Sequence, residues 1–274
     1  MFPIILKIII KVAIMPKISA YILTYNEETK IEDAIKSVTW ADEVLVIDSN
    51  STDSTVPIAK SLGAGVVTIP FEGFGRLRNS ATNACSHDWI FSLDADERCT
   101  PEAAREIRNT VEKSDSSDAY YVPRRNWFMG RWINHSGWYP DYRQPQLFRK
   151  GCLIYHDEDE VHEGYHVNGS VGYLEKPIWQ LPFHNLEQLL YKINRYSSLG
   201  SEKMIRRGVK GGLIKALTHG IAAFLQVYIL KLGFLDGWAG FVIALSNCEV
   251  TFYRYSKLTE KQHKWDMPPE NRDI

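Results

Sequence analysis

The sequence predicts an α/β fold, in which a mostly parallel central sheet is flanked by helices and is followed by a helical C-terminal region. Three observations support this prediction. Apolar strands alternate with helical patterns over residues 17–121, polar side chains follow three of these strands, and the composition becomes strongly apolar after residue 212. The chain has 274 residues, of which 45% are hydrophobic, enough for one large domain with an appendage.

The first half of the chain alternates between short apolar runs and segments whose apolar residues lie three or four positions apart. The predicted strands are residues 17–23, 43–47, 64–69 and 89–93. The predicted helices are residues 28–38, 54–62, 75–86 and 101–114. Asp53 would cap the second helix, Gly63 would stop it, and Pro101 would open the fourth. This order predicts parallel strands with helices on both faces of the sheet.

The remaining segments suggest the domain organisation. Residues 1–16 form an apolar extension that Lys7 and Lys11 interrupt, and they contain no signal-peptide cleavage pattern. We expect a catalytic domain over residues 17–184, with a ligand-binding half at 17–121 and an irregular, aromatic-rich half at 122–184. Asn185 would cap a helix that opens a helical region over residues 185–274.

Polar residues stand at the carboxyl ends of three predicted strands, where ligands collect in such sheets. They are Thr24-Tyr25-Asn26-Glu27, Asp48-Ser49-Asn50 and Asp94-Ala95-Asp96. Residues two apart in an extended chain point the same way, so Asp94 and Asp96 would converge. A hard divalent cation relieves the repulsion between two carboxylates, and the oxygens of a nucleotide diphosphate would complete its coordination. The pattern therefore predicts a Mg²⁺ or Mn²⁺ site, although a D-x-D sequence also occurs on solvated loops.

Two further segments would serve the same ligand. Asp48 follows the run VLVI and can accept hydrogen bonds from a ribose or a base, whereas the alternative is a simple turn. Arg76 and Arg78 lie in GFGRLRN, where glycine permits close approach and arginine can grip a phosphate in two places. The alternative for either arginine is a solvated helix face.

These segments carry a specific resemblance. LTYNEE, VLVIDSNSTDST, GFGRLRNSA and WIFSLDADE resemble, in this order and spacing, the family 2 glycosyltransferases of the GT-A fold, over about residues 17–114. The later QLFRKG and VHEGYHVNGSVGYLEKPIWQLPFHN are similar to the branch of β-1,4-glucosyltransferases that builds lipopolysaccharide core. The family often has a second Asp where this chain has Ser49, so only Asp48 is carried over.

The resemblance implies an inverting, metal-dependent transfer from a nucleotide diphosphate sugar, with UDP the expected nucleotide, to a lipopolysaccharide-core or other cell-envelope glycan. The residues expected to bind the sugar donor are Thr24, Tyr25, Glu27, Asp48, Arg78 and Asp94. Asp94 and Asp96 would form the metal motif, and a downstream histidine, His184, is the candidate for a further metal or phosphate contact, although a lone histidine is more often structural.

The segment His162–His166 allows two hypotheses. It fits H-E-x-x-H, the zinc metalloprotease pattern with Glu187 as a distant third ligand, but that pattern requires a helix, which Gly164 disfavours. The alternative is that Glu163 is the general base that takes a proton from the acceptor hydroxyl in an inverting transfer. The acidic run at residues 157–160 competes with Glu163 but is more typical of a solvated loop.

Other classes of function differ in testable features. Transfer to polyprenyl phosphate would need no base, because that acceptor is already ionised. A nucleotidyltransferase would have a glycine-rich loop where this chain has TYNEE, and a binding protein would retain nucleotide affinity without turnover. Acceptor sugars are expected at Trp138, Tyr139 and Arg143, although aromatic residues at this density more often form core. A net charge of −1 argues against nucleic acid as a partner.

The apolar segment Leu213–Leu232 is long enough to cross a bilayer, but Lys215, His219 and Gln226 fall on one helical stripe. That pattern predicts an amphipathic helix lying in the membrane surface. Basic residues nearby would favour an anionic leaflet; they are Lys203, Arg206, Arg207, Lys210 and Lys215. The alternative is packing against the catalytic domain or a second subunit of a homo-oligomer. Four cysteines without C-x-x-C spacing fit a cytoplasmic protein, which we expect at the cytoplasmic face of the inner membrane.

Overall fold

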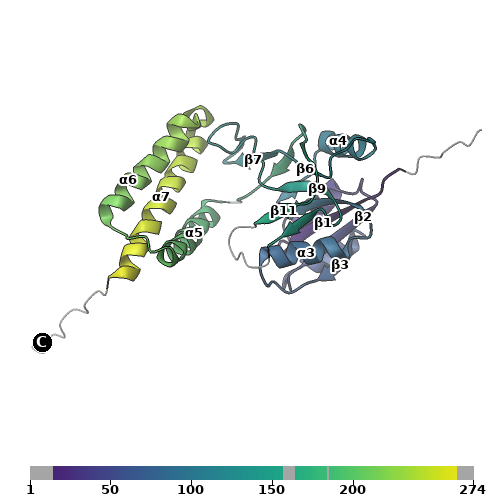
Figure 1. Cartoon of the computed structure of the whole chain (residues 1–274), viewed down its shortest axis with the longest axis horizontal. Helices are drawn as coiled ribbons and strands as arrows, with labels where there is room; N and C mark the ends of the chain where they lie inside the picture. Colours follow the sequence, from purple (N-terminus) through teal and green to yellow (C-terminus); the bar gives the residue numbers. More distant parts are fainter. Residues whose placement is uncertain (1–14, 157–163, 184, 264–274) are drawn as a thin grey trace, which may run out of the picture.

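The computed structural model describes residues 15–156, 164–183 and 185–263. This part of the chain forms two lobes, a sheet domain over residues 18–180 and a helical lobe over residues 186–262 (Figure 1). The sheet domain has a mixed sheet flanked by helices, and the helical lobe follows it in the sequence. The predicted fold class is confirmed.

The main sheet, within the described residues, has seven strands in the order β12-β6-β9-β4-β1-β2-β3. Their bounds are β1 Ile18–Thr24, β2 Glu43–Asp48, β3 Gly65–Thr68, β4 Trp89–Asp94, β6 Ala119–Tyr121, β9 Pro145–Arg149 and β12 Val171–Tyr173. Strands β3, β2, β1 and β4 are parallel, and β9 runs antiparallel to both β4 and β6. The carboxyl ends of β1, β2 and β4 therefore meet at one edge, as the sequence predicted.

Four helices cover this sheet, and the alternation of side chains along β1 shows how. The helices are α1 Ile31–Ser37, α2 Thr55–Ser61, α3 Phe74–Ala84 and α4 Pro101–Val111. Ile18, Ala20 and Ile22 point to a core shared with α1, α2 and α4. Tyr21 and Leu23 point the other way, to a core shared with α3. All of β1 is buried because it is covered on both faces.

Two helices begin later in the chain than the sequence predicted. The first helix begins at Ile31 rather than at residue 28, because residues 28–30 form a turn in which the Glu27 carbonyl accepts from the backbone N–H groups of Lys30 and Ile31. The second begins at Thr55 with Ser54 at its N-cap position. Asp53 is therefore not the cap; its carboxylate accepts from the N–H groups of Thr55 and Glu28.

Residues 97–180 also build two smaller sheets. One contains β5 Glu97–Arg98, β13 Ile178–Gln180, β7 Arg124–Phe128 and β8 Arg131–Trp132, in that order. The other pairs β10 Leu153–Tyr155 with β11 Tyr165–Val167. The first matters for the site, because it places β13 and β7 beside the segment that follows the end of β4.

The helical lobe consists of α5 Leu186–Arg206, α6 Leu213–Leu225, a π-helical turn η1 Gln226–Leu230, a 3₁₀ turn η2 Gly233–Asp236 and α7 Gly237–Gln262. The predicted cap of α5 is confirmed, since the Asn185 side chain accepts from the backbone N–H of Gln188. Positions four apart on α5, such as Leu189, Ile193 and Ser197, are buried. This spacing lets α5 pack along α7.

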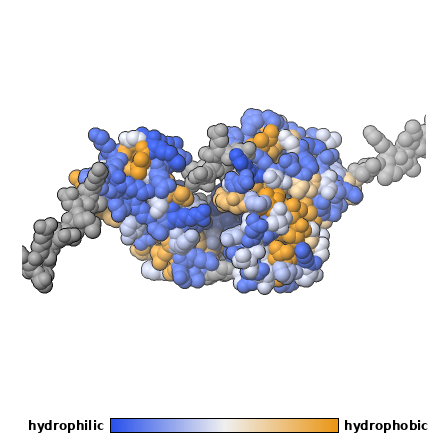
Figure 2. All heavy atoms as spheres, turned by 90° about the horizontal axis from the view of Figure 1, so that it is seen from below, coloured by the Kyte–Doolittle hydropathy of each residue, from blue (hydrophilic) through white to orange (hydrophobic). Residues whose placement is uncertain are grey.

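The two lobes are joined by one buried carboxylate and a shared apolar core. Asp236 accepts hydrogen bonds from the backbone N–H groups of Asn134 and His135 and from the Ser136 hydroxyl, at 2.7–3.1 Å. The shared core combines Phe128 and Ile133 with residues of α5 and α7. Between the lobes the surface is hollowed, as Figure 2 shows.

Candidate active site at the ends of β1, β2 and β4

The loops that follow β1 and β2 are held together by side-chain hydrogen bonds to the backbone. The Asn26 N–H donates to the Ser51 hydroxyl at 2.8 Å, and the Thr52 N–H donates to the Asn26 side-chain oxygen at 2.8 Å. Asn26 adopts a φ of 53°, in the left-handed region that Asn tolerates better than most residues. The Glu27 N–H donates to the Thr55 hydroxyl at 2.8 Å. These bonds fix the two loops as one rim of the site.

Asp48 lies at the floor of this rim, opposite Thr24 in the register of β1 and β2. It is almost fully buried, and its Oδ2 accepts from the Ser51 N–H at 3.0 Å. Its Oδ1, together with the hydroxyls of Thr24 and Ser49, is buried without a hydrogen-bond partner among the described residues. Buried polar atoms normally have partners, so this cluster suits a ligand that brings donors such as ribose hydroxyls or a base N–H.

Tyr25 and Glu27 stand above this floor. The Tyr25 side chain is largely exposed, and its ring is open to a planar ligand. Glu27 pairs with Lys30, whose Nζ lies 2.9 Å from the Glu27 Oε2. Both side chains therefore lie on the rim where the sequence predicted them.

Arg78 reaches the site from α3, on the side of the sheet opposite α1. Gly75 lets α3 pack closely on the end of β10, because a Cβ at that position would lie 2.2 Å from the His156 carbonyl oxygen. The buried Arg78 guanidinium donates to the Ser92 hydroxyl at 3.2 Å and to Asp94 Oδ1 at 3.1 Å. Arg78 thus holds the Asp94 carboxylate in place and compensates its charge.

Asp94 and Asp96 stand two residues apart at the end of β4, as predicted. The half-buried Asp96 carboxylate accepts from the Gln180 side-chain amide at 3.3 Å. Loss of surrounding water, together with the negative charges of Glu97 and Asp94, raises the pKa of Asp96 to about 7. Asp96 is therefore a carboxylate that a nearby cation would stabilise.

Sequence reasoning missed the buried group behind the two aspartates. Glu97 is fully buried, where it pairs with the Arg124 guanidinium and accepts from the Gln146 amide at 3.0 Å. Its Oε2 also accepts from the Asp94 backbone N–H at 2.9 Å. This network fixes the turn after β4. The sequence signal was present, since Glu97 completes the run DADE, but the partner Arg124 lies 27 residues further along the chain.

The described residues supply part of the coordination that a hard cation requires. Asp94 and Asp96 supply carboxylate oxygens, the ligand type that Mg²⁺ and Mn²⁺ prefer. No group of three or more His, Cys, Asp or Glu suited to a metal occurs in the described ranges. Two carboxylates leave room for phosphate oxygens, as expected for a site that is completed by its substrate. His184, the predicted additional ligand, and Glu163, the predicted base, lie outside the described residues.

The zinc protease hypothesis fails on local structure in the described part of its motif. His166 lies on β11, opposite Ile154 of β10, and not on a helix. The pattern requires both histidines on one helix, and His166 does not meet that requirement; His162 and Glu163 lie outside the described residues. Gly164 was expected to disfavour a helix, and the residues that follow it form a strand, β11.

The residues predicted to bind the acceptor lie beyond the aspartates, toward the helical lobe. Trp138 packs against Phe128 and lines a cavity between the lobes. Tyr139 is half-buried next to it, and Arg143 is exposed and paired with Asp141 at 2.6 Å. Sequence reasoning missed Lys192 of α5. Loss of surrounding water lowers the pKa of the Lys192 ammonium, and the negative charge of Asp96 opposes that shift. The Lys192 side chain is still exposed to solvent.

Comparisons with known proteins agree with this architecture. The profile described as Glycosyl transferase family 2 matches residues 19–175. A glycosyltransferase of Rickettsia bellii, described as uncharacterized, is 32% identical over 269 residues, which cover 94% of this chain and 91% of that protein. The lipopolysaccharide core biosynthesis glycosyltransferase LpsC of Rhizobium meliloti is 28% identical over 261 residues. That alignment covers 90% of this chain and 94% of LpsC.

Solved structures give weaker matches. Residues 1–349 of TarS from S. aureus align with a TM-score of 0.49 and 16% identity, over 90% of this chain and 91% of that one. The glucosyl-3-phosphoglycerate synthase of Mycobacterium tuberculosis, in complex with Mn²⁺, UDP-glucose and phosphoglyceric acid, aligns with a TM-score of 0.36 and 26% identity. That alignment covers 40% of this chain and 44% of the synthase.

Proposed function

Because the chain belongs to family 2 of the glycosyltransferases and has the GT-A fold, we propose that it transfers a sugar from a UDP-sugar to a cell-envelope glycan of the lipopolysaccharide-core type, with inversion at the anomeric carbon. The single observation that carries the proposal is the pair of carboxylates at the end of β4, one of them with a pKa raised to about 7. The similarity to LpsC supports the choice of acceptor class.

The sugar donor would lie across the ends of β1, β2 and β4. The buried Asp48 Oδ1 would accept a hydrogen bond from the nucleoside, and the Ser49 hydroxyl would donate one. Tyr25 and Glu27 would lie along the rim. Asp96 and Asp94 would hold Mg²⁺ or Mn²⁺, which when bound neutralises charge on the leaving diphosphate. Arg78 keeps the Asp94 carboxylate oriented toward that position.

Glu163 is the proposed general base for the acceptor hydroxyl. An inverting transfer requires one group to remove this proton while the hydroxyl oxygen attacks from the face opposite the nucleotide. Glu163→Gln should lower kcat at least a hundredfold and leave UDP binding unchanged. A polyprenyl phosphate acceptor needs no base, so full activity of Glu163→Gln would favour that alternative.

The experiment that tests the donor class is a screen of nucleotide sugars. The protein is heated with each compound, with and without Mn²⁺, and the shift in Tm is measured, since a ligand that binds the folded state raises its stability. UDP-sugars with Mn²⁺ should give the largest shifts, and the best compound then enters a transfer assay. Equal shifts with and without Mn²⁺ for every compound would contradict the proposal.

We also propose that the helical lobe attaches the protein to the cytoplasmic face of the inner membrane. Leu213–Leu230 is one helical segment, among the described residues, that is long and apolar enough to cross a membrane by length and composition. It buries Ala216, Gly220 and Val227 against α7. A separate apolar face stays open to solvent, and its residues are Leu213, Ile214, Leu217, Ile221, Leu225 and Leu230.

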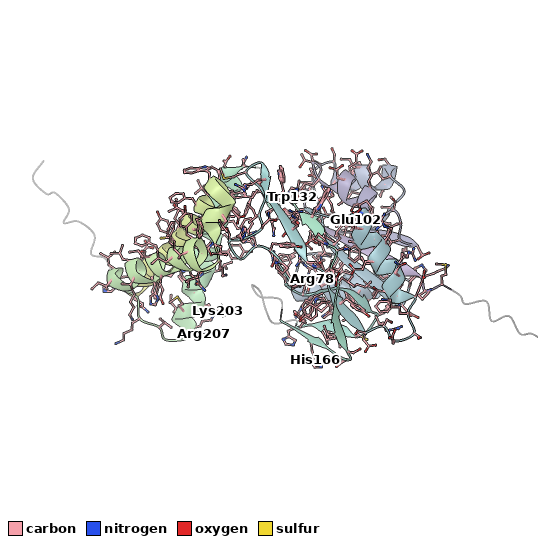
Figure 3. The ribbon with its side chains drawn as sticks, turned by 90° about the horizontal axis from the view of Figure 1, so that it is seen from above. Arg78, Glu102, Trp132, His166, Lys203 and Arg207 are labelled. Carbon is pink, nitrogen blue, oxygen red and sulfur yellow. The ribbon has the colours of Figure 1, made fainter. Side chains whose placement is uncertain are left out.

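The packing of this helix favours a position in the membrane surface over a crossing. It lies along α7, whose second half carries Glu249, Arg254 and Lys257, and a crossing would draw these charges into hydrocarbon. The exposed apolar face runs along the whole of α6, as expected for a helix that lies in the interface. Lys203 and Arg207 at the end of α5 (Figure 3) add attraction to an anionic leaflet.

The membrane proposal is tested by sedimentation with vesicles that contain phosphatidylglycerol. Replacement of Ile214, Leu217 and Ile221 by Ser should reduce bound protein at least tenfold, and 1 M NaCl should weaken binding of the unchanged protein. Phe71→Ser, which removes an exposed aromatic side chain from the sheet domain, is the matched control and should bind normally. Protein that stays in the supernatant at low salt would contradict the proposal.

A further inference from the structure

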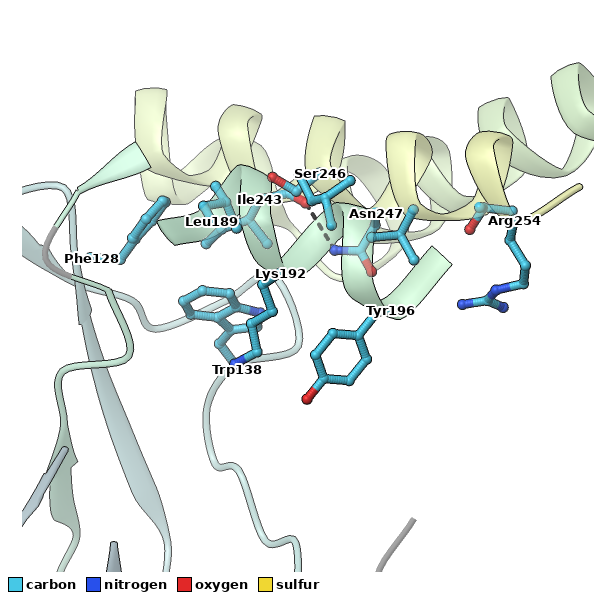
Figure 4. Close-up of a pocket in the computed structure, with 12 residues that line it drawn as sticks. Phe128, Trp138, Leu189, Lys192, Tyr196, Ile243, Ser246, Asn247 and Arg254 are labelled. Atoms are coloured by element: carbon cyan, nitrogen blue, oxygen red, sulfur yellow. Dashed lines mark hydrogen bonds between the residues drawn. The ribbon is translucent and has the colours of Figure 1, made fainter. Parts of the chain in front are cut away.

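A cavity of about 240 Å³ lies between the helical lobe and the loop after β8, beside the candidate active site (Figure 4). We call it the interlobe groove. Its lining residues come from three parts of the fold: Phe128 and Trp138 from the sheet domain, Leu189, Lys192, Ile193 and Tyr196 from α5, and Ile243, Ser246, Asn247, Val250, Thr251 and Arg254 from α7.

The charge of this groove has one sign. Lys192 and Arg254 line it, and none of the described residues that line it is acidic. Neither cation forms an ion pair within the described residues, and the buried Arg254 Nε has no hydrogen-bond partner there. Elsewhere in the protein, buried arginines such as Arg78 and Arg124 are paired with carboxylates. The interlobe groove therefore has positive charge that the described protein does not neutralise.

The walls of the groove suit a sugar ring. Trp138 and Tyr196 present aromatic faces, and Lys192 lies 5.8 Å from the centre of the Tyr196 ring. The hydroxyl of Ser246, the amide of Asn247 and the hydroxyl of Thr251 add polar groups on the α7 side. Aromatic faces with a few polar groups are a common combination in small-molecule sites.

The groove lies close to the candidate active site at its Trp138 end. Asn126 of β7 donates to the Trp138 carbonyl at 3.0 Å, and its neighbour on β13, Gln180, donates to Asp96 at 3.3 Å. At the other end, the α7 residues from Ile243 to Arg254 extend over about 16 Å at 1.5 Å per residue. A ligand in the groove would thus begin next to the aspartates and extend away from them.

We infer that the interlobe groove binds the glycan acceptor and that the acceptor carries anionic groups, carboxylates or phosphates, one held by Lys192 and another by Arg254. This inference rests on the proposed function, since it names the class of acceptor for that reaction. The reacting hydroxyl lies at the Lys192 end, near the aspartates, and the remainder of the glycan follows α7 toward Arg254. The sugar donor occupies the opposite side, on the ends of β1 and β2.

The test is a binding titration followed by ligand-observed NMR. The probes are glucuronate and glucose 6-phosphate, which combine a ring with a charge; glucose, which has the ring alone; and glycerol 3-phosphate, which has the charge alone. The variants are Lys192→Met and Arg254→Met, and Lys261→Met is the control, because Lys261 lies on α7 outside the groove and pairs with Glu202. Lys192→Arg keeps the charge and serves as a rescue.

The charged sugars should bind at least fivefold more tightly than glucose or glycerol 3-phosphate. The double variant Lys192→Met/Arg254→Met should abolish that preference, because a small probe can bind at either cation. Each single variant should weaken it, Lys192→Arg should retain it, and Lys261→Met should not alter it. Equal binding of glucose and the charged sugars would overturn the inference. Equal binding of glycerol 3-phosphate would point to a lipid phosphate instead of a glycan and would overturn it as well.

The same samples separate this inference from the proposed function. Each is heated with UDP and Mn²⁺, and the shift in Tm is measured. If the unchanged protein shows no shift, the proposed function fails, while the sugar titration still decides what the groove binds. If the unchanged protein shows a shift that Lys192→Met removes, Lys192 belongs to the site of the sugar donor and the acceptor assignment fails.

Discussion

Positively charged side chains have carboxylate partners at the sheet edge but none, among the described residues, in the interlobe groove. At the sheet edge, Arg78 is paired with Asp94, and Arg124 is paired with Glu97. In the groove, Lys192 and Arg254 have no carboxylate partner within the described residues. Charges that are paired inside the protein fix its geometry, whereas unpaired charges on an open wall are available to another molecule. The contrast teaches that the first region is preorganised and the second is built to receive a ligand.

The largest expected effect is the loss of transfer rate on replacing Asp96, the carboxylate at the sheet edge that has no ion-pair partner among the described residues. Asp96→Asn should lower the rate of sugar transfer at least about a thousandfold, which corresponds to about 4 kcal/mol of transition-state stabilisation. The reason is that the variant loses a charged ligand for the cation. Initial rates with the UDP-sugar found in the screen provide the measurement. Asp53→Asn, on the same loop system but directed to backbone N–H groups, should retain most activity.

The second effect contrasts the two regions in stability. Glu97→Gln should reduce the free energy of unfolding by about 3 kcal/mol, because it leaves the Arg124 guanidinium buried without its counter-charge. Arg254→Met should change stability by less than about 0.5 kcal/mol, since that guanidinium has no such partner. Urea unfolding of both variants measures the difference. Equal losses would show that the groove is as structural as the sheet edge.

The third effect is a smaller dependence of stability on pH. In the folded protein the pKa of Asp96 is raised to about 7, above its ordinary value of 3.8, so between these values the folded state keeps a proton that the unfolded state has released. Stability should therefore fall as the pH rises from about 4 to 7, by about 1–2 kcal/mol for this half-buried group. Asp96→Asn should abolish this part of the pH dependence. The measurement is thermal unfolding of both proteins across this pH range, with no metal added.

Much of the sheet domain could be predicted, because its signals are local. The order of strands and helices, the cap of α5 at Asn185 and the polar strand ends all follow from periodicity and from residues within one turn. The start of α1 was misplaced because residues 28–30 form a turn, and a long-range bond from the Glu28 N–H to Asp53 ties that turn to the neighbouring loop. Short-range patterns do not contain that information.

Only the site residues that directly follow the strands were predictable from the sequence. Asp48, Asp94 and Asp96 follow apolar strands and were found for that reason. Glu97 was adjacent but looked like one more acidic residue, since its partners Arg124 and Gln146 come from β7 and β9. Lys192 lies nearly one hundred residues after Asp96, and only the packing of the helical lobe on the sheet domain brings the two charges together.

The most direct test of the central claim is the binding of Mn²⁺ in the presence of UDP, measured by titration calorimetry at pH 8. The account predicts that UDP strengthens Mn²⁺ binding and that Asp96→Asn weakens it at least tenfold, with the variant still folded. It also predicts weaker binding at pH 6, where a proton competes for Asp96. Equal Mn²⁺ affinity in the unchanged protein and in Asp96→Asn would contradict the account.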